Sequence, residues 1–175
     1  GNLQSWFTQQ VTTLLSDSDV NVRCAILARS YEISVFLGQR VSTFVPILEN
    51  LAADPDWRVR ISVLDAAPAF AEVIPADTVY PLVLAGQTDS NEAVVVHALR
   101  ATAEFVRRAL VDRMAVYQLF RVVGFLCHPC AWIREASIGV IVAAARQLPE
   151  EDVWTMLYLA VRPLLLSDIT ALDEP

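Results

Sequence analysis

The segment Cys127-His-Pro-Cys130 contains the residue types that most directly suggest chemistry. Two thiols in this spacing act as a redox pair in some proteins, because a helix N-terminus lowers the thiol pKa. Such redox motifs normally accompany a β-α-β pattern, and this sequence shows none. We therefore favour a structural turn here, and keep thiol-redox chemistry through Cys127 and Cys130 as the alternative.

A metal site is the second chemistry to consider. A structural zinc ion normally takes four protein ligands, usually as two local pairs. Only Cys127, Cys130 and His128 are neighbours in the sequence, whereas Cys24 and His97 lie far from them. His97 falls within an apolar helical pattern, where we expect a hydrogen-bonded structural histidine. We predict neither a metal site nor a cofactor.

The remaining patterns do not suggest catalysis either. Carboxylate pairs occur at Asp54 with Asp56 and at Glu150–Asp152, but each stands where a helix should begin, and helix capping explains it. The five glycines are scattered and form no phosphate-binding loop, and no G-x-S-x-G motif occurs. We predict no catalytic residue, so this segment is not expected to be an enzyme.

A seven-residue pattern that recurs four times organises the chain. Its copies begin at Asp17, Asp54, Asp89 and His128, so successive copies lie 37, 35 and 39 residues apart. Apolar residues on both sides of each copy follow a helical period. A helix–turn–helix unit of about 35 to 40 residues is typical of an α-solenoid. We therefore predict an all-α fold, an α-α superhelix of HEAT repeats with four helix pairs and one further helix.

The boundaries follow from the turn residues between apolar segments. First helices are predicted near 3–15, 41–53, 77–87, 112–127 and 150–166, and second helices near 19–37, 57–73, 91–109 and 131–147. The repeats are then expected near 1–38, 41–74, 77–109 and 112–148, with a half repeat at 150–167 and a flexible tail at 168–175. We expect Pro68 to kink its helix. The buried stripe of the first helix should be Leu3, Trp6, Phe7, Val11 and Leu14.

The repeat residues predict a ladder between neighbouring turns. An Asp before a helix accepts hydrogen bonds from the first-turn amides and meets the positive end of the helix dipole. The Arg at the seventh position projects from the next helix toward a neighbouring turn. The ladder residues are Asp17, Arg23, Asp54, Arg60, Asp89 and Arg134, and the pattern breaks at Val95 and His128. The alternative is that these arginines bind phosphate.

The place of each tryptophan in the repeats suggests its role. Trp6, Trp57 and Trp132 are expected as packing anchors at repeat junctions. The segment Val153–Val161 is apolar almost all round, so it should be covered on more than one side. We expect Trp154 and Tyr158 to lie at an interface, covered by a continuing chain or by another protein, and favour a fragment of a larger multidomain protein.

Composition limits the class of partner. The 175 residues are 55% hydrophobic and 19% charged, which excludes a disordered chain. The formal net charge is −7 and all 13 basic residues are Arg, so neither nucleic acid nor an anionic membrane surface is expected as a ligand. No apolar run reaches the roughly 20 residues that a bilayer crossing needs. Three cysteines and no signal-peptide pattern indicate an intracellular, cytoplasmic protein.

Two segments go beyond a general HEAT pattern. They are Asp54-Pro-Asp-Trp-Arg-Val-Arg60 and Phe125-Leu-Cys-His-Pro-Cys-Ala-Trp-Ile-Arg134, the latter followed by Gly139, Ala145-Arg146 and Asp152-Val153. Over about residues 50 to 166 the sequence resembles the HEAT region of the protein-kinase-like regulatory (scaffold) subunit of the class III phosphatidylinositol 3-kinase, or vacuolar protein sorting, complex. Cys130 stands where that family often has Asn, a better helix cap.

The resemblance implies a scaffold that lies between a kinase-like domain and a WD-repeat propeller. Its partners would be the lipid kinase catalytic subunit and a Beclin-type subunit, in a complex that acts in autophagy and endosomal sorting and sits peripherally on endosomal and autophagic membranes. A HEAT scaffold of another complex, such as a phosphatase scaffold or a transport receptor, is the alternative. A nucleic-acid-binding HEAT array would need an Arg-lined concave face.

Overall fold

The structure is a computed structural model that describes residues 2–165, apart from the side chains of Asn2, Phe120 and Leu165. Every regular element in this range is helical, which confirms the all-α prediction. The chain divides into two compact units, Gly1–Thr102 and Ala103–Pro175, and each is described by itself. The predicted tail at 168–175 lies outside the described residues. None of the helices within 2–165 has the length and hydropathy that a bilayer crossing requires.

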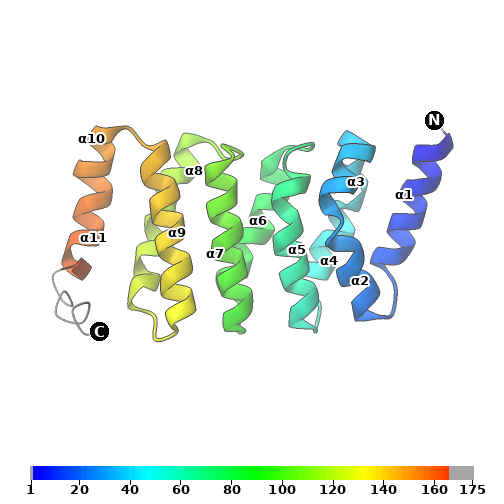
Figure 1. Ribbon diagram of the computed structural model, residues 1–175, viewed down its shortest axis with the longest axis horizontal. Helices are drawn as coiled ribbons and strands as arrows, with labels where there is room; N and C mark the ends of the chain where they lie inside the picture. Colours follow the sequence, from blue (N-terminus) through cyan, green and yellow to red (C-terminus); the bar gives the residue numbers. More distant parts are fainter. Residues whose placement is uncertain (1, 166–175) are drawn as a thin grey trace. The chain divides into compact units, whose positions relative to one another are not determined.

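The first unit is a set of paired helices joined by short turns (Figure 1). Its elements are α1 (Asn2–Leu15), α2 (Val20–Leu27), α3 (Ser30–Leu37), the 3₁₀ helix η1 (Gly38–Phe44), α4 (Val45–Ala52), α5 (Trp57–Phe70), α6 (Ala76–Gly86) and the first part of α7 (Glu92–Arg107). α5 packs against α2, α3, α4 and α6, and therefore stands at the centre of this unit. In Figure 1, α4 and α6 lie behind the row formed by α1, α2 with α3, and α5.

The buried face of α5 follows the helical period. Val59 and Val63 are fully buried one turn apart, and Phe70 closes the same core. In α1 the pattern differs from the prediction, because Val11 and Leu15 are buried while Leu3, Trp6 and Leu14 are exposed. Within its unit α1 packs mainly on α2 and α3, and Arg40 of η1 donates a hydrogen bond to Ser5 of α1 at 3.3 Å.

Two predicted helices are interrupted. The predicted helix at 19–37 is two helices, because Arg29 leaves the helical region at φ −101° and ψ 20°. The predicted helix at 41–53 begins as 3₁₀ and becomes α-helical at Val45. Pro46 has no N–H to donate to the Ser42 carbonyl, and Val45 N–H takes that acceptor with the tighter 3₁₀ spacing. α5 runs through Pro68 and ends two residues later at Phe70.

The second unit pairs a long helix with an irregular one. Its elements are α8 (Arg113–Gln118), the 3₁₀ helix η2 (Leu119–Cys127), α9 (Ala131–Gln147), α10 (Glu150–Asp152), the π-helical turn η3 (Val153–Leu157) and α11 (Tyr158–Leu165). α9 packs on η2 and α8, and α11 packs on η2. Ile133 and Val140 of α9 are buried. Ala109, in the residues after α7, adopts a positive φ of 52°.

Candidate functional site

The repeat turns are built by two successive side-chain acceptors. In the first turn Asp17 Oδ1 accepts the Asp19 N–H at 2.8 Å, and Asp19 Oδ1 then accepts the Asn21 N–H at 2.8 Å. Asp54 and Asp56 repeat this arrangement in the second turn, and Asp89 and Asn91 repeat it in the third. The helix cap is therefore the third residue of the pattern, and the first residue shapes the turn before it.

The seventh residue of the pattern clamps its own turn. Arg23 Nη1 donates to the carbonyl oxygens of Asp17 and Ser18 at 2.6 and 3.2 Å. Arg60 Nη1 does the same with Asp54 and Pro55 at 2.8 and 3.3 Å. The backbone carbonyl oxygens thus hold the guanidinium group in place through contacts within its own repeat.

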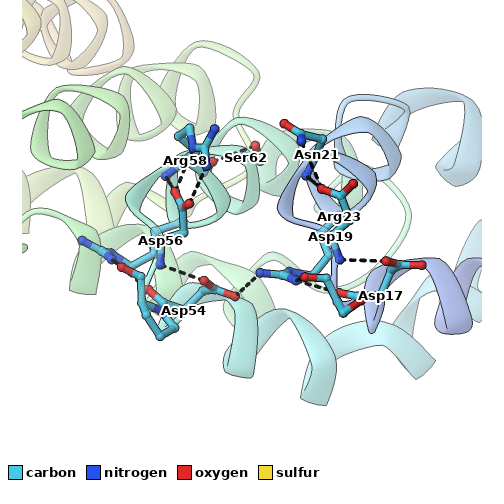
Figure 2. Close-up of polar contacts among 11 residues, drawn as sticks. Asp17, Asp19, Asn21, Arg23, Asp54, Asp56, Arg58 and Ser62 are labelled. Carbon is cyan, nitrogen blue, oxygen red and sulfur yellow. Dashed lines mark hydrogen bonds and ion pairs between the residues drawn. The ribbon is translucent and has the colours of Figure 1, made fainter.

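The same arginines contact the next turn in the first unit. Arg23 Nη2 lies 3.0 Å from Asp54 Oδ2 (Figure 2). Arg60 holds both oxygens of Asp89, with Nε to Oδ2 at 2.8 Å and Nη2 to Oδ1 at 2.9 Å. The four side chains are only 12 to 15% exposed, so these ion pairs are largely shielded from water. The structure thus brings Asp17, Arg23, Asp54, Arg60 and Asp89 together in one continuous row of contacts.

Hydrogen bonds from Arg lower the pKa of Asp89, in this row, and of Asp56, the helix cap beside it. The Arg60 side chain holds the pKa of Asp89 below its ordinary value. The Arg58 side chain and backbone N–H lower the pKa of Asp56 from 3.8 to about 2. These carboxylates are charged at neutral pH and already have cationic partners, so they are poorly suited to act as general acids.

The fourth turn uses a histidine in place of the first Asp. His128 Nδ1 lies 3.1 Å from the Cys130 N–H and serves as its acceptor, which requires the Nδ1 lone pair. Arg134 Nη1 clamps this turn through the carbonyl oxygens of His128 and Pro129 at 2.7 and 2.8 Å. The Cys130 side chain makes no cap hydrogen bond, as expected for a Cys where Asn would cap better.

The cysteines and His97 form no common site. Cys127 is exposed at the end of η2, Cys130 precedes α9, and the three cysteines are free thiols. His97 is paired with Asp65 at 2.7 Å and is half-buried, as a hydrogen-bonded structural histidine should be. Among the described residues no group of three or more His, Cys, Asp or Glu side chains is placed to hold a metal ion.

The prediction that three tryptophans are packing anchors was wrong. Trp6, Trp57 and Trp132 are 56, 45 and 64% exposed. All three lie on helix faces that are not covered within their own unit. The helical period of apolar residues predicts a buried stripe, but it does not tell which side of that stripe a neighbouring helix covers. Trp154 is also exposed, at 59%, and its ring meets Tyr158 edge to face at a centroid distance of 5.5 Å.

We define the end patch as Trp154, Met156, Tyr158 and Leu159, which are all exposed large apolar residues. It lies on η3 and the start of α11. The Tyr158 N–H donates to the Val153 carbonyl, five residues back, which widens the helix into a π-turn. Short π-turns of this kind are frequent at functional sites.

Sequence reasoning missed one polar cluster in the second unit. Arg113 and Tyr117 of α8 both contact Asp152 Oδ2 of α10, Arg113 at 2.9 Å, and the hydrogen bond from the Tyr117 hydroxyl is short. The hydrogen bonds from Tyr117 and Arg113 lower the pKa of Asp152. The cluster ties the helix that carries the end patch to α8. Its partners are 35 and 39 residues apart in sequence, and the only signal was a charged residue at each helix start.

Comparison with known proteins decides the family. The family model "PIK3R4-like, middle domain" matches residues 1–175. This chain belongs to the PIK3R4-like middle-domain family. The match confirms the predicted resemblance to the regulatory subunit of the class III phosphatidylinositol 3-kinase complex, and disfavours a phosphatase scaffold or a transport receptor.

Relatives of this middle domain are named as kinases. The chain is 26% identical over 173 residues to the probable serine/threonine-protein kinase vps15 of Dictyostelium discoideum, covering 94% of this chain and 9% of the relative. It is 27% identical over 152 residues to the serine/threonine-protein kinase VPS15 of Arabidopsis thaliana, covering 83% of this chain and 10% of that relative. The chain thus spans about a tenth of the length of these relatives.

A solved structure supports the repeat fold of the PIK3R4-like middle domain. A chain from the study "Crescerin uses a TOG domain array to regulate microtubules in the primary cilium" aligns with a TM-score of 0.60 at 14% identity, covering 93% of this chain and 74% of that one. The likeness concerns the fold alone, and it confirms the predicted class of HEAT-type helical repeats.

Proposed function

We propose that this segment is a non-enzymatic scaffold that bridges subunits of a class III phosphatidylinositol 3-kinase complex. The family match over the whole chain supports membership of the complex. The proposed partners are the lipid kinase catalytic subunit and a Beclin-type subunit. Through them the segment would act in autophagy and endosomal sorting, peripherally on the membranes concerned.

The end patch is the observation that carries the proposal. Trp154 and Leu159 are 59 and 56% exposed on consecutive turns, and Met156 and Tyr158 lie between them. Burying apolar surface stabilises a complex by about 25 cal/mol per Å². Trp and Tyr are also among the residues that most often dominate the binding energy of protein interfaces. The patch therefore suits a protein partner with an apolar surface.

The Asp–Arg row supports a structural part in this proposal. Each of Arg23 and Arg60 already binds two carbonyl oxygens and a carboxylate, and Arg23 Nε, which has no hydrogen-bond partner, is buried, so neither side chain is well placed for a phosphate group. We propose that the row fixes the register of the repeats near 1–38, 41–74 and 77–109. The repeat near 112–148 and the half repeat at 150–167 would then present the end patch.

The test compares two pairs of equally exposed apolar residues in the full-length protein. Trp154→Ser with Leu159→Ser alters the end patch, and Trp6→Ser with Leu3→Ser alters α1, where the two side chains are 56 and 66% exposed. Affinity for the catalytic and Beclin-type subunits is measured by co-purification and titration. We expect the first pair to weaken assembly at least about tenfold and the second to leave it unchanged.

Helix content by circular dichroism shows that both variants are folded. Equal assembly by both variants, or equal loss by both, would contradict the end patch as the docking face. If the whole segment can be removed without loss of assembly, the scaffold proposal itself fails.

A further inference from the structure

The exposed side of α9 carries large apolar residues. Trp132, Ile138 and Val142 are 64, 52 and 44% exposed, whereas Ile133 and Val140 on the other side of the helix are buried. The exposed residues follow one another at three- and four-residue steps and therefore form one stripe along the helix. We define the α9 face as Trp132, Glu135, Ile138, Gly139, Val142 and Arg146. Contiguous apolar surface that is open to water marks an interaction site.

The earlier copies of the repeat cover the position that Ile138 occupies. Ile138 stands ten residues after the start of its copy, and the residues at the same position in the other copies are Leu27, Leu64 and Leu99. These leucines are 1, 3 and 0% exposed, compared with 52% for Ile138. The Leu64 side chain lies 3.0 Å from the point where a Cβ atom on Gly86, in α6 of the following repeat, would stand. This position is thus one on which a further helix packs, and on α9 it is open.

Two residues of the α9 face depart from the repeat pattern. At the position of Glu135 the earlier copies have Cys24, Ile61 and Val96, none of which is exposed. At the position of Trp132 they have Asn21, Arg58 and Ala93. A helix that covers the α9 face therefore meets a carboxylate and a large ring, neither of which the earlier copies present. Covering a carboxylate without a partner costs free energy, so the covering helix needs a basic residue opposite Glu135.

Opposite charges stand at two places on the α9 face. Glu135 and Arg146 are exposed, and within residues 2–165 neither side chain forms an ion pair or a hydrogen bond. They are 11 residues apart in the sequence, which corresponds to about 16 Å along a helix. Between them, a Cβ atom at Gly139 would meet open space, so the backbone of another helix can approach closely there.

We propose that the α9 face binds an amphipathic α-helix of a protein partner. Apolar side chains of that helix pack on Ile138 and Val142, and Trp132 supplies the largest contact area. A Lys or Arg of the helix meets Glu135 and an Asp or Glu meets Arg146, so these two partner residues stand about three helical turns apart. The inference rests on the proposed scaffold function and adds a second docking surface to the end patch.

Added bulk at Gly139 tests the docking in the full-length protein. Gly139→Gln places a side chain on the α9 face where the structure leaves open space, and glutamine is the better helix former, so the fold is kept. Gly124→Gln in η2 is the matched control, because a Cβ atom at Gly124 also meets open space. In titrations with the catalytic and Beclin-type subunits, we expect Gly139→Gln to weaken the binding of one of them at least about tenfold. Gly124→Gln should leave both affinities unchanged.

Charge reversal tests the chemistry of the partner helix. Glu135→Arg and Arg146→Glu should each weaken binding of the same subunit about two- to fivefold, and less at high salt. If Gly139→Gln weakens binding and neither reversal does, the proposed charges of the partner helix are wrong. Helix content by circular dichroism shows that each variant is folded.

Further results would overturn the docking itself. Equal binding by Gly139→Gln and Gly124→Gln would show that no partner covers the α9 face. A lower melting temperature of the free Gly139→Gln protein would assign the covering helix to the same chain, and a dimer that this substitution dissociates would assign it to a second copy. If removing the whole segment abolishes assembly while Gly139→Gln does not, only the α9 face is wrong. Assembly that survives the removal ends the scaffold proposal as well.

Discussion

The ion pair between Arg60 and Asp89 should couple two repeats measurably. Two charge-assisted hydrogen bonds at 2.8 and 2.9 Å join the side chains, which are 15 and 14% exposed. Bonds of this kind contribute about 1.5 to 3 kcal/mol when shielded, and the desolvation of both charges offsets part of that gain. We expect a coupling free energy of about 1 to 2 kcal/mol.

The single variants should cost more than the coupling. Arg60→Ala also removes the clamp on the Asp54 and Pro55 carbonyl oxygens, so we expect a loss of about 2 to 3 kcal/mol in the free energy of unfolding. Asp89→Ala also removes the acceptor for the Asn91 N–H. Urea unfolding of the two single variants and the double variant, followed by circular dichroism, gives the coupling directly.

A surface pair in the same unit provides the control. Arg29 and Glu32 lie 3.4 Å apart and are 72 and 60% exposed, so their coupling should stay below about 0.5 kcal/mol. If the cycle for Arg60 and Asp89 gives a value as small as this control, shielding does not strengthen the pair, and the row of contacts does not stabilise the stack as we argue.

Three further predictions concern backbone strain and pH. Gly38→Ala should lower stability by about 1 to 2 kcal/mol in thermal unfolding, because Gly38 has φ +55° and ψ −133°. A Cβ atom at this position would meet open space, so the loss would come from backbone strain and not from a clash. An unchanged melting temperature would contradict this. Ala109→Gly should raise stability by about 1 kcal/mol, because Ala109 adopts φ 52°, which glycine tolerates better. The turn is held by hydrogen bonds from the Ala109 N–H to the Val106 carbonyl and from the Leu110 N–H to the Phe105 carbonyl. Destabilisation by the substitution would show that the turn is not strained. Lowering the pH from 3.8 toward 2 should remove stability, because the pKa of Asp56 and that of Asp89 are lowered by folding. A carboxyl group of this kind stabilises the fold above its unfolded pKa and stops doing so as the pH falls through its folded pKa, and Asp89→Asn should reduce the pH dependence of urea unfolding in this range.

Recurring residue types made the repeat turns predictable. A turn Asp with an Arg six positions later occurs in the first two copies, and the third and fourth copies each keep one of the two residues, so the four turns could be placed from residue type and spacing. The buried starts of α5 and α9, at Val59 and Ile133, followed from the same register. The two-step turn, in which Asp19 or Asp56 is a second acceptor after the first Asp, is visible only in the structure.

The sequence by itself determined what depends on near neighbours: helical period, turn chemistry, the all-α repeat and the family resemblance. Only the tertiary structure decided which helix faces contact one another, and therefore which apolar residues are buried and which distant polar residues meet. Trp6 and Trp132 are exposed although they belong to the apolar pattern of helices whose other residues, such as Val11 and Ile133, are buried. Tyr117 reaches Asp152 because α8 and α10 lie close together, a proximity that sequence spacing does not encode.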